Sequence, residues 1–192
     1  MNTKKSRLAF VLRAAACVFF LCALTGAAWA KTLSLSAPSI ANEGGDLVVR
    51  FGVVVEDLPI LKGELDDGLT LRLSCEAALS RDFDYWMDSH ITSATFESQI
   101  SRDALAGEYV MELPGLERPL RNVDLRELLR QGWSDIAVKL GPWETLTRGH
   151  TYNLRLTNLI EDAEAPEGLT RYLYFWSWDA GSDSSFQLKF TY

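Results

Sequence analysis

The chain has 192 residues, of which 26 are acidic and 19 are basic, and its formal net charge is −7 at pH 7. An excess of negative charge repels phosphate backbones and anionic lipid headgroups. This composition therefore argues against nucleic-acid binding and against direct binding to a membrane surface.

The first 30 residues follow the pattern of a secretory signal peptide. Four basic residues come first, an apolar run covers 14–24, and the segment ends in Ala28-Trp29-Ala30, after which a signal peptidase would cut. The run is shorter than the about 20 residues of a transmembrane helix, and retention as an uncleaved anchor is the alternative. We expect 1–30 to be removed and the protein to be periplasmic or secreted.

Removal of the signal peptide changes the charge and the cysteine content. Four of the 19 basic residues lie within 1–30 and all 26 acidic residues lie beyond it, so the mature net charge is −11. Cys17 and Cys22 leave with the signal, and Cys75 alone cannot form an intramolecular disulfide. Residues 31–192 are long enough for one self-sufficient domain, which would bury roughly 70% of its unfolded surface.

The first half of this domain alternates apolar and polar residues with the period of a β-strand. After a short strand at 33–37, the odd positions of 47–55 and of 69–79 are apolar. Cys75 shares the inward face of 69–79, so we expect a buried and inert thiol. Between these strands, 57–65 is a possible short helix in which Pro59 fits only in the first turn.

The second half continues with short strands around one helix. The predicted strands cover 95–101, 108–113, 136–140, 152–156 and 184–192. A leucine stripe predicts a helix over Val123–Gln131, capped by Asn122 and stopped by Gly132. Eight or nine short strands with one or two helices indicate a mainly β fold, a two-sheet antiparallel β-sandwich.

Aromatic residues crowd 172–178, just before the last predicted strand. If 170–178 and 184–192 pair as a hairpin with the five-residue loop Asp179–Asp183, the even-numbered side chains share the buried face. A four-residue loop would reverse this parity. The five-residue loop leaves a small apolar patch outside, our candidate partner-docking surface, which consists of Leu173, Phe175 and Ser177.

Residue types that carry chemistry are sparse. The two histidines, His90 in an expected loop and His150 at a strand end, belong to no cluster of metal ligands and to no catalytic motif. We therefore predict no catalytic residues, no cofactor and no metal site. The Asp179–Asp183 loop offers oxygen ligands for calcium but lacks the closing glutamate of a twelve-residue calcium loop, so calcium binding there stays open.

Three sequence runs carry a family resemblance: Asp66-Asp67-Gly68-Leu69-Thr70-Leu71, Leu140-Gly141-Pro142-Trp143 and Trp176-Ser177-Trp178. In this order, after a signal peptide, they resemble the DUF4390 family of exported proteobacterial proteins with a domain of unknown function. The resemblance implies a bacterial envelope protein without established activity, cofactor or catalytic residues. Family members are sometimes encoded beside membrane histidine kinases, which implies a possible accessory role in envelope sensing.

Two functions from different classes fit these observations. The first is a non-catalytic exported module that binds a protein partner in the cell envelope. The second is a polysaccharide-binding or glycoside-processing domain, which would use the aromatic residues of 172–178 (the aromatic ladder) and the carboxylates of Asp82, Asp84 and Asp88. Solvated loop charge is the simpler explanation of those carboxylates.

Overall fold

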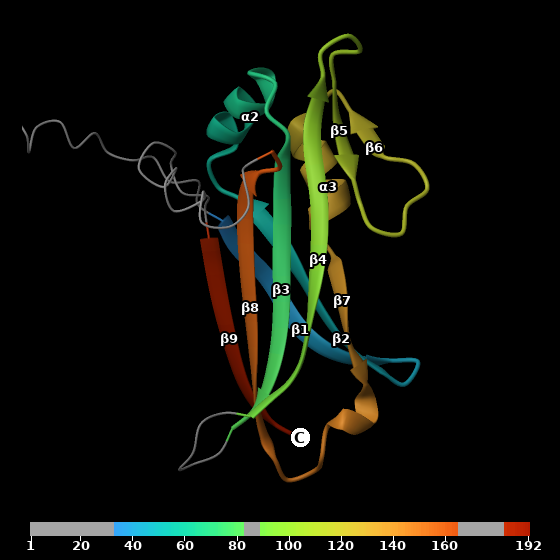
Figure 1. The fold of residues 1–192 in the computed structure, drawn as a ribbon, viewed down its shortest axis with the longest axis vertical. Coiled ribbons are helices and arrows are strands. Elements are labelled where there is room, and N and C mark those ends of the chain that lie inside the picture. The colour runs from blue at the N-terminus through green and yellow to red at the C-terminus, as the bar shows by residue number, and fades with distance from the viewer. Residues whose placement is uncertain (1–32, 83–88, 165–182) are drawn as a thin grey trace, which may run out of the picture.

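The computed structural model describes residues 33–82, 89–164 and 183–192, and within them it is a mainly β fold of two antiparallel sheets (Figure 1). The smaller sheet has the strand order β1-β2-β7 and the larger β6-β5-β4-β3-β8-β9. The strands are β1 (Leu33–Glu43), β2 (Asp46–Val55), β3 (Leu71–Arg81), β4 (Ser89–Asp103), β5 (Glu108–Glu112), β6 (Leu120–Asn122), β7 (Ile136–Pro142), β8 (Thr151–Asp162) and β9 (Asp183–Thr191). The predicted β-sandwich is therefore confirmed, while the predicted signal peptide lies outside the described residues.

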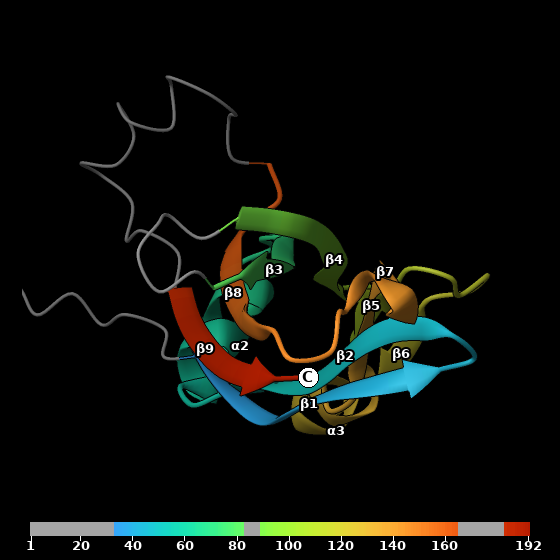
Figure 2. The same ribbon diagram turned by 90° about the horizontal axis from the view of Figure 1, so that it is seen from below.

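The core lies between the sheets because the strands bury alternate side chains. On β3 the odd-numbered residues from Leu71 to Leu79 are all buried, including Cys75, as the alternation predicts. The even-numbered residues of β8 from Tyr152 to Ile160 pack beside them. The sheets approach each other at two margins, where β4 lies beside β7 and β1 beside β9 (Figure 2). At the first margin, the Thr92 hydroxyl donates to the Leu140 carbonyl at 2.7 Å.

Helix α2 (Leu58–Asp66) joins β2 to β3 as predicted, with Pro59 in its first turn. It ends in a Schellman motif, in which the N–H of Gly68 bonds to the carbonyl of Leu65 and the N–H of Leu69 to that of Glu64. Gly68 takes a φ of +92°, which a residue with a side chain rarely adopts. Glycine therefore sets the sharp passage from helix to strand.

Helix α3 (Leu125–Trp133) corrects two predicted boundaries. Its N-cap is Asp124, whose side chain accepts from the N–H groups of Arg126 and Glu127, so the prediction that Asn122 caps it is wrong. Gly132 does not stop the helix but lies inside it. A Cβ there would come within 2.1 Å of the Met111 sulfur, so the close packing of α3 against β5 favours glycine at this position. The leucine stripe is buried as predicted, whereas Val123 stays outside the helix and exposed.

Strands β1 and β4 are longer than predicted and strand β6 was not predicted, each for an identifiable reason. Strand β1 continues to Glu43 through a register shift between Ser36 and Ser39, which breaks the two-residue period of the sequence. Strand β4 begins at Ser89, so the prediction that His90 lies in a loop is wrong. Near its start, the inward side chains of β4 are small and partly exposed, which hides the alternation of apolar and polar residues. Strand β6 has only three residues, too few for a periodic signal.

Candidate interaction surface

Most of the site residues predicted from the sequence lie outside the described part of the chain. This applies to the docking candidates Leu173, Phe175 and Ser177, to the aromatic ladder, to Asp84 and Asp88, and to the 179–182 part of the possible calcium loop. Of the two histidines, His90 is exposed on β4, and the Nδ1 of His150 lies 3.2 Å from the Arg148 carbonyl oxygen. The predictions on residues 165–182 therefore stay predictions.

The described residues contain neither a cluster of metal ligands nor a helix that could span a membrane. In ranges 33–82, 89–164 and 183–192, no three His, Cys, Asp or Glu side chains gather where they could hold a metal ion. Within the same ranges, no helix has the length and apolar character needed to cross a membrane.

A protruding hairpin formed by β4 and β5 is the most distinctive surface feature of the described residues. Strand β4 pairs with β3 as far as Ile100, opposite Leu71, and with β5 as far as Asp103, opposite Glu108. Because β4 extends past the start of β3, the turn between β4 and β5 projects beyond the sandwich at the end where α2 lies (Figure 1).

The turn at the tip of this hairpin is fixed by its own hydrogen bonds. One oxygen of Asp103 accepts from the backbone N–H groups of Leu105 and Ala106, each at 3.1 Å. The other accepts from Arg121 on β6, also at 3.1 Å. Gly107 closes the turn with a φ of +70° and an N–H bond to the Asp103 carbonyl. The bonds from Ala106 and Arg121 hold the pKa of Asp103 below its ordinary value of 3.8.

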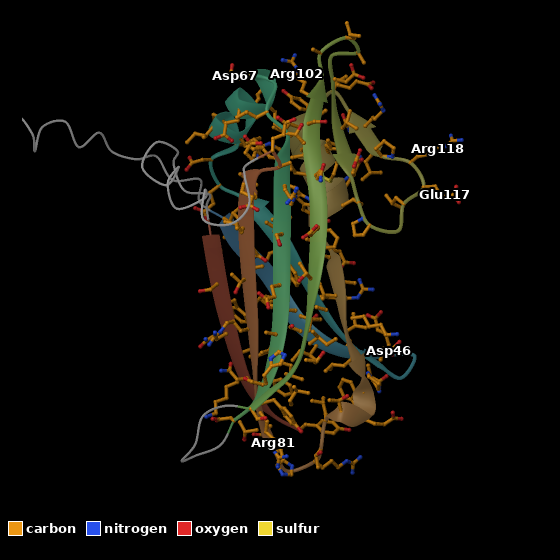
Figure 3. The ribbon with its side chains drawn as sticks, in the orientation of Figure 1. Asp46, Asp67, Arg81, Arg102, Glu117 and Arg118 are labelled. Carbon is orange, nitrogen blue, oxygen red and sulfur yellow. The ribbon has the colours of Figure 1, made fainter. Side chains whose placement is uncertain are left out.

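The base of the hairpin is attached to α2 through Asp66. This carboxylate accepts hydrogen bonds from Lys62 and from the Tyr109 hydroxyl, the latter at 2.9 Å, and it forms an ion pair with Arg102 at 2.9 Å. These hydrogen bonds lower the pKa of Asp66, and the one from Lys62 has the larger effect, ahead of the one from Tyr109. The guanidinium of Arg102 also lies 5.8 Å from the centre of the Tyr109 ring, a cation–π contact. Arg102 and Asp67 are labelled at this end of the molecule in Figure 3, and Arg81 at the opposite end.

Exposed apolar side chains gather at the same end. Leu105, at the tip of the turn, is fully exposed, and Val123, between β6 and α3, is 70% exposed. The register places both at the same end of the sheet, because Leu105 precedes Glu108 on β5 and Val123 follows Asn122, which pairs with Tyr109. We call Leu105, Val123 and the surrounding charged residues Asp103, Glu108 and Arg121 the hairpin surface.

The hairpin surface combines exposed apolar side chains with paired charges. Its charged groups are engaged with one another: Arg121 lies 3.1 Å from Asp103 and 3.8 Å from Glu108. The turn therefore presents an apolar side chain inside a polar rim, and protein interfaces likewise have an apolar core and a polar rim. Sequence reasoning missed it, although Asp103-Ala104-Leu105-Ala106-Gly107 carries turn residues at both ends. Period-two patterns do not report a single exposed leucine.

Comparisons with known proteins give a family and nothing more specific. A family model described as a domain of unknown function (DUF4390) matches residues 30–188. No curated protein and no solved structure matches the chain.

Proposed function

We propose that this chain, which belongs to the DUF4390 family of domains of unknown function, is a non-catalytic exported module that binds a protein partner in the cell envelope. The hairpin surface is the binding site. Export follows from the signal-peptide pattern of residues 1–30. The first described strand starts at Leu33, so removal of that segment would leave every described strand intact.

The exposure of Leu105 on a fixed turn carries this proposal. Single exposed apolar residues are common on protein surfaces and usually have no function. Leu105 differs because the hydrogen bonds of Asp103 and Gly107 fix the turn that carries it. Its side chain is fully exposed, so no contact of that side chain within the protein explains why the turn is fixed. A fixed turn loses little conformational entropy on binding, which raises affinity. Burial of one leucine in a partner's pocket would contribute about 2 kcal/mol.

Site-specific crosslinking tests the proposal in the intact envelope. A photoreactive amino acid replaces Leu105 in the full-length chain, and Val54, 47% exposed on β2 of the other sheet, serves as the matched control. We expect a crosslinked protein product at position 105 and none of the same mass at position 54. Equal crosslinking from both positions would contradict a specific site.

A pair of leucine variants then measures the contribution of the side chain. Leu105→Ser should keep the wild-type melting temperature, since the residue is fully exposed, and should weaken partner binding by about tenfold or more. Leu105→Met should restore most of the binding. If Leu105→Ser binds the partner as tightly as wild type, the hairpin tip is not the contact.

A further inference from the structure

One side chain in the core lacks the partners that its chemistry requires. The buried polar side chains among the described residues are Ser98 and Asn158. Ser98 accepts a hydrogen bond from the indole N–H of Trp133 at 3.0 Å. Asn158, on the inner face of β8, is completely buried, and neither its amide oxygen nor its amide nitrogen has a hydrogen-bond partner. Folded proteins seldom leave such a group unpaired.

The neighbours of Asn158 do not satisfy it. The strand register places it between Cys75 on β3 and Ser184 on β9. The thiol of Cys75 is a weak hydrogen-bonding group and is itself buried. A leucine at position 158 would fill a similar volume without leaving a polar group unpaired. The amide therefore requires an explanation other than packing.

The inward side chains are more deeply buried on β3 and β8 than on β9. The inward residues of β3 and β8 around Asn158 are all buried. The inward residues of β9 are only half-buried, and they are Ser184, Phe186, Leu188 and Phe190. Strand β9 thus presents an apolar, partly accessible inner face that begins beside Asn158.

Charge limits what can bind at this position. In the three rows of inner-face side chains nearest Asn158, the described residues on β4, β3, β8 and β9 include no charged group. A charged headgroup buried there would lack a counter-ion, which is strongly unfavourable. A neutral group that both donates and accepts hydrogen bonds, such as a carboxamide, would match the amide of Asn158.

We propose that the inner face of β8 and β9 binds an uncharged amphiphile. Its polar head pairs with the side-chain amide of Asn158, and its apolar tail lies along Phe186 and Leu188 on the inner face of β9. This site is independent of the hairpin surface, which lies at the end of the sheet.

Three probes with the same chain length separate the contributions of head and tail. Oleamide, oleate and 1-octadecene are offered to the purified mature protein from cyclodextrin, and native mass spectrometry measures the bound fraction. We expect oleamide to bind about tenfold more tightly than octadecene, because two hydrogen bonds are gained, and oleate to bind most weakly. If the protein retains none of the three probes, the proposal is wrong, and water alone would pair with Asn158.

Two leucine variants on one strand complete the test. Asn158→Leu should fold with at least the wild-type melting temperature, bind octadecene as well as wild type does, and lose the preference for oleamide. Asn153→Leu is the matched control, because Asn153 lies on the opposite face of β8, and it should keep the preference. An oleamide preference that survives in Asn158→Leu would overturn the assignment of the head to Asn158.

Discussion

Cys75 occupies the middle of β3, where its side chain is completely buried among Leu73, Ala77 and the facing core. Burial raises the pKa of this thiol to about 12, since the thiolate would have to form away from water. The neutral thiol is a poor nucleophile and a poor metal ligand at neutral pH. Cys75 is therefore a small packing residue.

Replacement of this cysteine should affect stability only. Cys75→Ala removes one buried sulfur atom, so the free energy of unfolding should fall by an amount on the order of 1 kcal/mol. Urea denaturation followed by tryptophan fluorescence measures the change. The inert assignment would be wrong if the folded variant failed to bind the partner, or if native wild-type protein reacted rapidly with a thiol reagent.

The N-cap of helix α3 is decided by the strand that precedes the helix. Asn122 and Asp124 are both good N-cap residues, and the sequence alone does not separate them. Asn122 is committed to β6, where it pairs with Tyr109, so the helix can start only after it. Its side chain instead accepts from the N–H of Asp124 and supports the turn into the helix.

The two caps should differ in their effect on stability. Asp124→Ala removes the acceptor for two backbone N–H groups, and the free energy of unfolding should fall by about 1 kcal/mol. Asn122→Ala removes one acceptor outside the helix and should have a smaller effect. Both are measured by chemical denaturation of otherwise identical proteins. A larger loss in Asn122→Ala would contradict the assigned cap.

The elements that sequence reasoning predicted correctly are those whose burial follows a simple period. Strands β3, β7 and β8 bury alternate residues, and β9 turns Phe186 and Phe190 inward as expected. The prediction failed where burial depends on distant residues. Gly132 reads as a helix stop until Met111 on β5 is placed beside it.

The candidate site was less accessible to sequence reasoning than the fold. Asp103 reads as an ordinary turn residue until Arg121 is brought to it from β6. Likewise, Asn158 continues an inward-facing strand without any sign that its amide would be unpaired. Both features depend on which strands become neighbours, and that information is not local.

At the scale of the whole molecule, the two ends of the sandwich differ. The end opposite the hairpin is closed by Trp143, whose backbone N–H bonds to Gly45 and whose indole N–H donates to the Tyr192 hydroxyl at 3.0 Å. The rings of Trp143 and Tyr192 meet edge to face, and the N–H of Tyr192 bonds to His150. These aromatic residues satisfy one another, whereas Leu105 at the other end contacts solvent. This asymmetry agrees with the binding site that we propose at the hairpin end.

The charge pairs also make the stability of the whole molecule depend on pH. Among the residues that the structure describes, four carboxyls have a lowered pKa, each with a basic or backbone hydrogen-bond donor as the main cause: Glu43, Asp66, Asp103 and Glu127. Arg130 lowers the pKa of Glu127 furthest, to about 2. The folded protein therefore holds these protons less tightly than the unfolded chain does. Their stabilisation is fully present above the ordinary values of 3.8 and 4.5 and is lost as pH falls through the folded values.

We accordingly expect the melting temperature to be nearly constant from pH 7 to pH 5 and to fall from about pH 4.5 toward pH 2. Asp103→Asn should fall less steeply, because asparagine keeps an acceptor for the turn but cannot take up the proton that wild type gains on unfolding. Glu117→Gln, on the exposed β5–β6 connection (Figure 3), is the control and should follow the wild-type curve. Scanning calorimetry at constant ionic strength measures all three, since salt screens exposed pairs. If Asp103→Asn and wild type lose stability in parallel across this window, the lowered pKa of Asp103 does not contribute to the acid response.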